Sequence, residues 1–521
     1  MVYPLRNRNF LSYENQNSTA YLVMGVLILL GCSENKEPIN PPNIVYILAD
    51  DLGYGDVSIY NPESKIKTPN IDKLASEGMR FTDAHSPSSV CTPTRYGILT
   101  GRYCWRTKLP TGVLRGYGQA LLEKDRTTIA SLLKEHKYTT GVIGKWHLGL
   151  DWVLKEEFKD SINSASVQKS ELGIITQMNG DWVDFTKKPT DGPLKHGFDY
   201  SYILPASLDM EPYCYLENDV LTELPNDHTP GNDLDTGSYA TEAFWRPGRI
   251  TKSFDFYDVL PKFIDKAKEF IQSHSKNEKP FFLYLPLAAP HSPWVPTKDY
   301  DGTSGAGQYG DFVQMVDAQI GSFLKSLDES KVSENTIVIF ASDNGPFWKP
   351  DFIKRFDHKA ADIYRGMKAD IYEGGHRIPF IVRWPGKVQA GSVSDFKTTL
   401  TNLIATSADV VGIQLNDRTG EDSQSIYPIL LNDDEKKTEA RPIVHHSSKG
   451  YFALRKGNWK LIEKRGSGGF SIPVIIEPNL GEPIGQLYNI AEDPSETNNL
   501  YSEKPELVKE LLAELNNIKN P

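Results

Sequence analysis

The chain has 521 residues, 39% of them hydrophobic, which is enough for one large globular domain and a smaller second one. The formal net charge of −11 argues against general nucleic-acid binding, and four cysteines are too few for a disulfide scaffold. A chain with this negative charge can bind an anionic ligand only where Lys, Arg and His side chains gather in a pocket.

The N-terminal segment has the features of an export signal. Residues 20–31 form an apolar run of about a dozen residues, shorter than the roughly 20 that a membrane-spanning helix needs. The run follows basic residues and ends in Leu-Leu-Gly-Cys, which resembles a bacterial lipoprotein signal with Cys32 as the lipid-bearing residue. An ordinary signal with a chance cysteine is the alternative. We expect a signal at 1–32, a polar tether at 33–41, and a body anchored to a bacterial membrane outside the cytoplasm.

The body begins with a strand pattern that recurs along the chain. Apolar, β-branched runs at 44–48, 140–143, 281–286 and 336–341 predict buried strands, and 128–136 and 259–274 have helical spacing. This alternation predicts an α/β sandwich with a mixed, mostly parallel sheet. Polar residues follow each strand, and the carboxyl ends of such strands usually bind ligands. We expect the following residues to converge: Asp50, Asp51, Lys145, His147, His291, Asp343 and Asn344.

The remaining segments are loops and a C-terminal part of different character. Residues 152–193 and 207–250 are polar and irregular, as loops that shape access to a site often are. Residues 445–462 alternate like a hairpin, and 503–518 predict a terminal helix. We therefore expect a catalytic domain at 42–439 and a small α+β subdomain with an antiparallel sheet at 440–521.

The segment CTPTRYGILTGR at 91–102 contains the most specific motif in the chain. It resembles the signature of type I sulfatases, Cys-x-Pro-Ser/Thr-Arg followed by Leu-Thr-Gly. The resemblance implies that Cys91 is oxidised to formylglycine (3-oxoalanine) by a formylglycine-generating enzyme or an anaerobic sulfatase-maturating enzyme. The hydrated aldehyde then provides a geminal diol, of which one hydroxyl attacks sulfur and the other later expels sulfate. The alternative is an unmodified buried thiol.

The same resemblance implies a metal site. Asp50, Asp51, Asp343 and Asn344 match the family's metal-binding positions, and the modified Cys91 is a further ligand. These are hard oxygen ligands, which suit Ca²⁺ or Mg²⁺ better than Zn²⁺, and the family resemblance favours one Ca²⁺ per chain. Alone, the Asp pair could cap a helix and Asp-Asn-Gly could form a turn.

Three further segments resemble the family's sulfate pocket: 144–149, 289–293 and 365–386. Lys145 and Lys368 are expected to bind sulfate oxygens, and His291, with Lys368 as a second candidate, to protonate the leaving alcohol. His147 is expected to take a proton from the diol, and Arg95 to orient it. We interpret Glu373 as structural.

The resemblance covers nearly the whole mature chain and implies the alkaline phosphatase superfamily fold. The expected substrate is a sulfated carbohydrate, such as algal ulvan or carrageenan or a glycosaminoglycan fragment. The alternatives are a phosphodiester or phosphonate ester hydrolase and a non-catalytic lipoprotein that binds sulfated glycans. Met367, Ala369 and Asp370 depart from the family pattern beside Lys368 and leave substrate geometry open.

Some residues have two open interpretations. Cys104 and Cys214 either form a disulfide or are buried thiols, because spacing alone does not decide. Eight loop residues either contact a sugar or pack inside the protein: Trp105, Arg106, Arg115, Tyr117, Asp209, Tyr213, Trp245 and Arg246. The oligomeric state stays open.

Overall fold

Strand β1 (Asn43–Ala49) lies in the middle of the fold, and all of its residues are buried. The computed structural model describes residues 41–520 except 165, 171–172, 233–242 and 434–438. The predicted signal, Cys32 and the tether up to residue 40 lie outside the described residues. Within the described part, no helix has both the length and the apolarity needed to cross a membrane.

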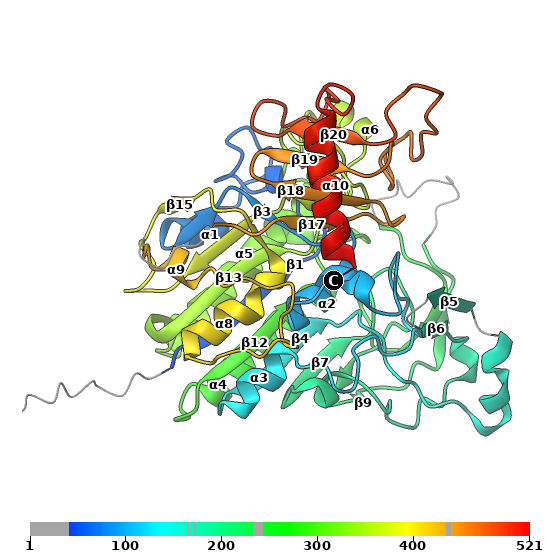
Figure 1. The fold of residues 1–521 in the computed structure, drawn as a ribbon. Coiled ribbons are helices and arrows are strands. Elements are labelled where there is room, and N and C mark those ends of the chain that lie inside the picture. Colours follow the sequence, from blue (N-terminus) through cyan, green and yellow to red (C-terminus); the bar gives the residue numbers. More distant parts are fainter. Residues whose placement is uncertain (1–40, 165, 171–172, 233–242, 434–438, 521) are drawn as a thin grey trace, which may run out of the picture. The chain divides into compact units, whose positions relative to one another are not determined.

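Among the described residues, the large sheet has ten strands, and it is mostly parallel in its centre (Figure 1). Its order is β15 (Ser392–Ser394), β2 (Met79–Phe81), β14 (Phe380–Arg383), β13 (Thr336–Ser342), β1, β12 (Phe281–Pro286), β4 (Thr139–Lys145), β7 (Tyr200–Leu204), β8 (Leu216–Glu217) and β9 (Val220–Leu221). The strands β13, β1, β12, β4 and β7 pair in parallel. All the predicted strands are therefore confirmed, and they are neighbours.

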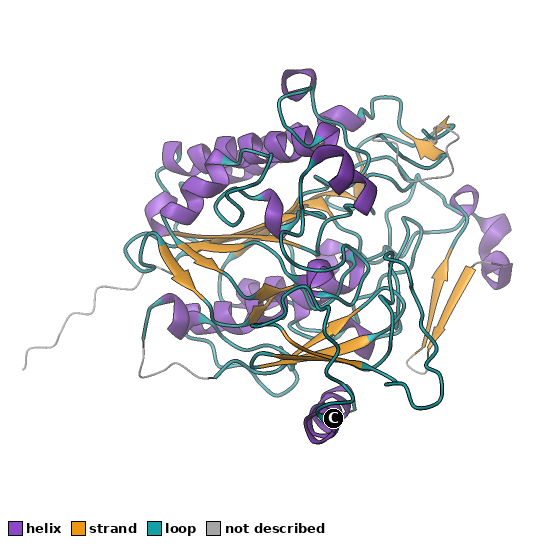
Figure 2. Cartoon of the chain, turned by 90° about the horizontal axis from the view of Figure 1, so that it is seen from above, coloured by secondary structure: helices purple, strands orange, loops and turns teal. Residues whose placement is uncertain are grey.

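Helices cover both faces of this sheet (Figure 2). Alternate residues of β1 point to opposite faces, so Tyr46 and Leu48 join one core while Val45 and Ile47 join the other. The first core includes residues of α2 (Cys91–Thr100), α3 (Ile129–Glu135) and α8 (Leu403–Val411). The second includes residues of α1 (Pro69–Ser76), α4 (Val259–His274) and α5 (Gly307–Glu329). The continuous apolar strands thus reflect burial on two sides.

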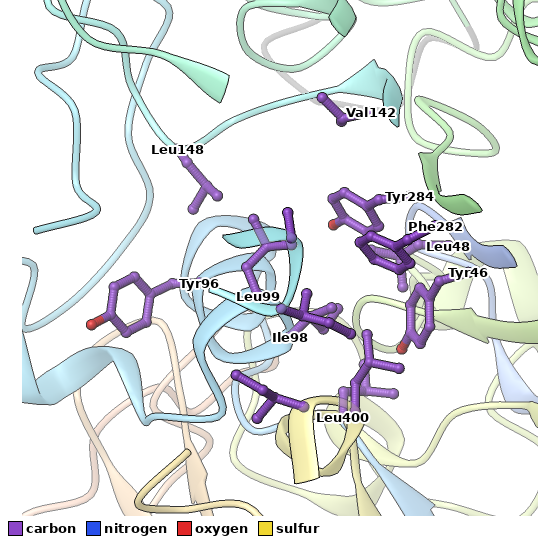
Figure 3. Close-up of a cluster of buried hydrophobic side chains, with 14 of the residues drawn as sticks. Tyr46, Leu48, Tyr96, Ile98, Leu99, Val142, Leu148, Phe282, Tyr284 and Leu400 are labelled. Atoms are coloured by element: carbon purple, nitrogen blue, oxygen red, sulfur yellow. The ribbon is translucent and has the colours of Figure 1, made fainter. Parts of the chain in front are cut away.

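Helix α2 is buried along its whole length. Ile98 and Leu99 lie in the same apolar cluster as Tyr46, Leu48 and Leu400 (Figure 3). The helix ends at Gly101, which adopts a left-handed conformation with φ 64° and donates its N–H to the carbonyl of Gly97. Each fully buried Leu or Ile side chain contributes about 1.5–3 kcal/mol. This packing fixes the N-terminal end of α2.

The C-terminal part forms a second, antiparallel sheet. Its strands are β17 (Ile443–His446), β18 (Phe452–Lys456), β19 (Trp459–Ile462) and β20 (Gln486–Asn489). Helix α10 (Pro505–Lys519) packs on this sheet through Val508, Leu511 and Leu515. The predicted hairpin and terminal helix are confirmed. Several short elements lie outside these sheets: β3 (Ala84–His85), β16 (Thr398–Thr399), β10 (Asp227–Thr229), β11 (Gly248–Ile250), α6 (Pro350–Phe356), α7 (Glu373–His376) and α9 (Tyr427–Leu430).

The segment predicted as irregular loops at 152–193 contains a hairpin. Strands β5 (Ser166–Ser170) and β6 (Gly173–Gln177) pair antiparallel, after a 3₁₀ segment at Glu156–Ser164. The sequence of β5 is polar, so it has no apolar alternation from which a strand could be predicted.

Candidate active site

The carboxyl ends of four neighbouring strands meet at one place. Asp50 and Asp51 follow β1, and Asp343 and Asn344 follow β13. Lys145 ends β4, with His147 two residues further on, and His291 lies in the segment after β12. Because these strands are parallel neighbours, their polar ends converge on a single buried cluster.

Cys91 occupies the first position of helix α2 in this cluster. Its side chain is 2% exposed, and its Sγ lies 3.6 Å from Oδ1 of Asp50. Burial raises the pKa of the Cys91 thiol far above its usual value. The thiolate is the nucleophilic form of cysteine, so unmodified Cys91 is a poor nucleophile at neutral pH. The positive end of the α2 dipole favours an anion next to this residue.

Carboxylates and basic groups alternate around Cys91. Lys145 Nζ lies 2.7 Å from Asp50 Oδ2, and Lys368 Nζ lies 2.6 Å from Asp51 Oδ2. Arg95 donates from Nε and Nη2 to Asp343 Oδ2, at 3.1 and 2.8 Å. Together the contacts hold these six fully or nearly fully buried charges in fixed positions.

Positive charge controls the ionisation of Asp50. Burial alone would raise the pKa of Asp50, but Lys145 first, then His291, Arg95 and Lys368, hold the pKa well below its usual value. Asp50 is therefore ionised at neutral pH and can serve as an oxygen ligand.

Two residues of the cluster have strained backbones. Asp51 has φ 64° and His147 has φ 54°, a region that side-chain-bearing residues rarely adopt. Each such residue costs about 1–3 kcal/mol, and such strain concentrates at functional sites. The hydrogen bond from Asp51 N to Asp343 Oδ1, at 3.2 Å, is one of the contacts that hold this conformation.

The two histidines differ in hydrogen bonding. His147 Nε2 lies 2.8 Å from the carbonyl of Leu114, so Nε2 carries the proton. His147 Nδ1 is buried and has no hydrogen-bond partner among the described residues. Burial, together with Lys145 and Arg95, lowers the pKa of His147 well below its usual value. His291 Nδ1 donates to the carbonyl of Ser292 at 2.5 Å, and its Nε2 lies 3.6 Å from Asp51 Oδ2. A neutral His147 with an unused lone pair can accept a proton.

The donor set fits a divalent cation. Potential ligand atoms of Asp50, Asp51, Cys91 and His291 lie within 4.8 Å of one another, and all four side chains are buried. Asn344 Nδ2 donates to Asp51 Oδ1 at 2.7 Å, whereas Asn344 Oδ1 is buried and has no hydrogen-bond partner within the described part of the chain. A hard cation bound next to the aspartates would give the Asn344 amide oxygen the partner that it lacks.

A cavity of about 420 Å³ opens above this cluster. Asp51, Cys91, His147, His291 and Lys368 contribute to its wall. Arg95 and Lys145 are fully buried behind it. The following residues also line it: Val90, Gly112, Val113, Asp209, Met210, Arg246, Ser292, Phe347, Lys349, Ser448 and Phe470.

Sequence reasoning missed several of these neighbours. Phe347, Lys349, Ser448 and Phe470 line the cavity, but no motif marks them. Ser207 accepts a hydrogen bond from Lys145 Nζ at 3.2 Å, and it was missed because a lone serine in a loop carries no sequence signal.

The residues with two open interpretations divide clearly. Asp209 and Arg246 form an ion pair and line the cavity. The other six do not line the cavity. Trp105 stacks on Tyr103, Trp245 stacks on Phe256, and Arg106 pairs with Asp422. Tyr117 and Tyr213 are buried, and Arg115 is exposed.

Two other predictions concern residues away from the cavity. Cys104 and Cys214 are buried free thiols, so the disulfide alternative is wrong. Glu373 accepts hydrogen bonds from Arg377 at 3.2 and 2.7 Å, so it supports that arginine.

Comparisons with known proteins agree with this site. The family model described as Sulfatase matches residues 42–413. An N-acetylgalactosamine-6-O-sulfatase of Bacteroides thetaiotaomicron is 34% identical, covering 96% of this chain and 98% of the relative. Human arylsulfatase A is 29% identical, covering 83% of this chain and 77% of the relative. A solved structure from work on glycosaminoglycan metabolism by B. thetaiotaomicron superposes with a TM-score of 0.77 at 34% identity, covering 92% of this chain and all of that one.

Proposed function

The chain belongs to the sulfatase family, and from this premise we propose that it releases inorganic sulfate from a sulfated amino sugar of a glycosaminoglycan. One observation carries the proposal. Cys91 lies at the base of a cavity, between the ion pairs of Asp50 with Lys145 and of Asp51 with Lys368. This places the modifiable side chain among carboxylates that can hold a cation and ammonium groups that can bind a sulfate.

The first step needs a hydroxyl at position 91. Oxidation of the Cys91 side chain by a sulfatase-maturating enzyme gives an aldehyde, which water converts to a geminal diol. One diol oxygen attacks sulfur, the bond from sulfur to the substrate oxygen breaks, and the alcohol leaves. His291 and Lys368 line the same cavity and are the two candidates for donating the proton that the leaving oxygen takes. Lys368 carries its protons as an ammonium group, whereas His291 uses its Nδ1 proton on the Ser292 carbonyl and can donate from Nε2 only when the ring is doubly protonated.

The second step uses the remaining diol hydroxyl. His147 Nδ1 accepts its proton, the carbon–oxygen bond to the sulfate group breaks, and the aldehyde forms again with release of sulfate. The Leu114 carbonyl keeps the Nε2 proton of His147 in place, so that Nδ1 stays the basic atom. Arg95, held by Asp343 and by the carbonyl of Lys145, keeps the neighbouring carboxylates in position.

We propose that the cation is Ca²⁺, held by Asp50, Asp51, Asp343, Asn344 and the modified residue 91. When bound, the ion supplies positive charge that lowers the pKa of the nucleophilic hydroxyl and offsets the charge of the sulfate group. Oxygen donors and the absence of a required thiolate favour Ca²⁺ over Zn²⁺.

The proposed substrate rests on the relatives. The bacterial relative at 34% identity is named for N-acetylgalactosamine 6-sulfate, and so is the rat relative at 28% identity. We therefore propose 6-O-sulfated N-acetylgalactosamine as the first substrate to test. The lipoprotein-like segment ending at Cys32 supports a further proposal, namely that the enzyme works outside the cytoplasm, anchored to a bacterial membrane.

The test uses residues 33–521 coexpressed with a formylglycine-generating enzyme. We expect the peptide containing residue 91 to show the mass loss for conversion of a thiol to an aldehyde, and sulfate release from 6-O-sulfated N-acetylgalactosamine. The panel includes the 4-O-sulfated isomer, sulfated galactans and a phosphodiester. Cys91→Ala should be inactive. Cys91→Ser should retain a sulfo group, because a serine ester cannot eliminate sulfate. Conversion of Cys91 with hydrolysis of the phosphodiester alone would refute the proposal.

A further inference from the structure

A loop of the C-terminal part, residues 466–473, is fastened to the segment that carries Lys368. Asp370 is fully buried, and its Oδ1 accepts hydrogen bonds from the main-chain N–H groups of Phe470 and Ser471 at 2.7 and 2.9 Å. Its Oδ2 accepts from Met367 N at 3.0 Å. One carboxylate thus joins the loop to the catalytic segment.

Close backbone contact reinforces this attachment. Ile371 N donates to the carbonyl of Ser467 at 2.8 Å. A Cβ at Gly469 would lie 2.3 Å from the carbonyl carbon of Ala369, so a residue with a side chain could not occupy this position without displacing backbone. Ala369 follows Lys368 directly and has φ 75°. The loop therefore has a fixed position relative to Lys368.

The attachment presents an aromatic ring to the cavity. Phe470 lines the cavity, yet 51% of the residue is exposed. Its ring meets Phe347 edge to face, with centroids 5.8 Å apart and an angle of 85° between the planes. An exposed aromatic ring leaves apolar surface in water, and sugar-binding sites cover such rings with the apolar face of a pyranose. Since hydrogen bonds fix the loop, the ring does not need to be ordered when a ligand binds.

A basic group lies beside these rings. Lys349 Nζ lies 5.3 Å from the centroid of Phe347 and lines the same cavity. The other long basic side chains of the cavity wall, Lys368 and Arg246, are paired with Asp51 and Asp209. Within the described part of the chain, Lys349 has no such carboxylate partner, so its charge is available to an anionic ligand.

We propose that Phe470, Phe347 and Lys349 form a second subsite, which binds an acidic sugar linked to the sulfated one. The pyranose ring stacks on Phe470, and its carboxylate pairs with Lys349. This inference rests on the proposed function, because it takes the sulfated sugar to lie over Cys91. It assigns Phe470, Phe347 and Lys349 as the residues that distinguish such an oligosaccharide from a sulfated monosaccharide, and it makes Asp370 a positioning residue for Phe470.

The kinetic test compares a uronic-acid-containing sulfated disaccharide with a small aryl sulfate. We expect Phe470→Ala to lower kcat/KM for the disaccharide about tenfold more than for the aryl sulfate, mainly by raising KM. A tenfold effect corresponds to the loss of one stacking contact. Phe470→Trp should retain most of the preference. Lys349→Ala should reduce the preference at low ionic strength only, and should have no effect on a disaccharide whose carboxyl is reduced to an alcohol. Ile472→Ala is the matched control, since it removes an exposed side chain (92% exposed) from the same loop but not from the cavity wall.

A binding test judges the subsite without turnover. In the Cys91→Ala background, calorimetry should show tighter binding of the disaccharide than of the sulfated monosaccharide. Phe470→Ala or Asp370→Ala should reduce this difference, and Phe470→Ala combined with Lys349→Ala should abolish it. Equal affinities for the two sugars, or an Ile472→Ala effect as large as that of Phe470→Ala, would overturn the inference. If the wild type releases no sulfate but the difference in binding persists, the proposed function fails and the subsite stands.

Discussion

His147 Nε2 donates a hydrogen bond to the carbonyl of Leu114 over 2.8 Å, while its Nδ1, next to the cavity, is buried and finds no partner in the part of the chain that the structure describes. A carbonyl oxygen can only accept, so this contact decides which ring nitrogen carries the proton. An unsatisfied buried acceptor is costly unless a ligand uses it. In the proposed mechanism the diol at position 91 provides the missing donor, so that His147 acts in the second half of the reaction.

His147→Ala should therefore block the release of sulfate more than its transfer. We expect the variant to show one rapid turnover and then to stop, with a mass increase of one sulfo group on the peptide containing residue 91. Loss of a general base lowers the rate about 10²–10⁴-fold. Intact-protein mass spectrometry after mixing with substrate measures this directly. A variant that shows neither the burst nor the added mass would assign His147 to the first step or to structure.

Removing the proposed Ca²⁺ should affect stability as well as activity. The carboxylates of Asp50 and Asp51 lie close together, and a bound cation would relieve their repulsion. At a Ca²⁺ concentration 100 times Kd, binding stabilises the folded state by about 2.7 kcal/mol. We expect a chelator to lower Tm and stop sulfate release, and Ca²⁺ to restore both. Asp51→Asn should lose the response of Tm to Ca²⁺.

The control for that experiment is Asp357→Asn, which neutralises a carboxylate that is 95% exposed and pairs with Lys65. Its Tm should respond to Ca²⁺ as the wild type does. If Zn²⁺ restored activity and Ca²⁺ did not, the assignment of the cation would be wrong.

Lys368 should contribute to catalysis more than to substrate binding. Its ammonium group lies 2.6 Å from Asp51 and lines the cavity, where the proposed mechanism builds up negative charge as the sulfur–oxygen bond breaks. Loss of one preorganised donor lowers kcat about 10²–10³-fold. We expect Lys368→Ala to show a loss of this size in steady-state kinetics, and Lys354→Ala, at an exposed position, to show none. A change in KM alone would contradict the proposed role.

Thiol titration can test two conclusions at once. Residues 33–521 contain three cysteines, and Cys91, Cys104 and Cys214 are all free thiols in the structure. Denatured without a reducing agent, the unconverted protein should therefore react with three equivalents of a thiol reagent, and the converted enzyme with two. A count lower by two in both forms would mean that Cys104 and Cys214 form a disulfide after all.

The sequence predicts the centre of the site well because the polar residues of the site directly follow the predicted strands along the chain. Asp50 and Asp51 directly follow a buried apolar run, and so do Asp343 and Asn344, so a parallel sheet is enough to bring them together. Likewise, Cys91 is recognisable from its own neighbours along the chain.

The rim of the cavity could not be predicted in this way. Phe470 reaches the cavity through hydrogen bonds to Asp370, and the contacting residues are about a hundred positions apart in the chain. No local pattern marks that contact. Asp370 was visible only as a departure from the family motif, and its role emerges only when the two segments are seen together.

Acid should destabilise the protein through buried neutral histidines, and His446 gives the clearest case. This residue is 2% exposed, and it lies in β17 against Trp105 and Phe452. Burial and the charge of Lys519 lower the pKa of His446 from 6.5 to about 4. In the unfolded chain the side chain binds a proton below pH 6.5, whereas in the folded protein it does so only below about pH 4.

The stability that a neutral His446 confers is therefore fully present above pH 6.5 and declines as the pH falls towards 4. The slope is about 1.4 kcal/mol per pH unit, which amounts to about 3 kcal/mol over this window. His446→Phe keeps an aromatic ring but cannot titrate. We expect urea titrations to show that the free energy of unfolding falls less for the variant than for the wild type between pH 7 and pH 4, by about 3 kcal/mol. His228→Phe, at an exposed position, should follow the wild type. Parallel curves for His446→Phe and wild type would show that His446 does not titrate differently in the folded and unfolded chains.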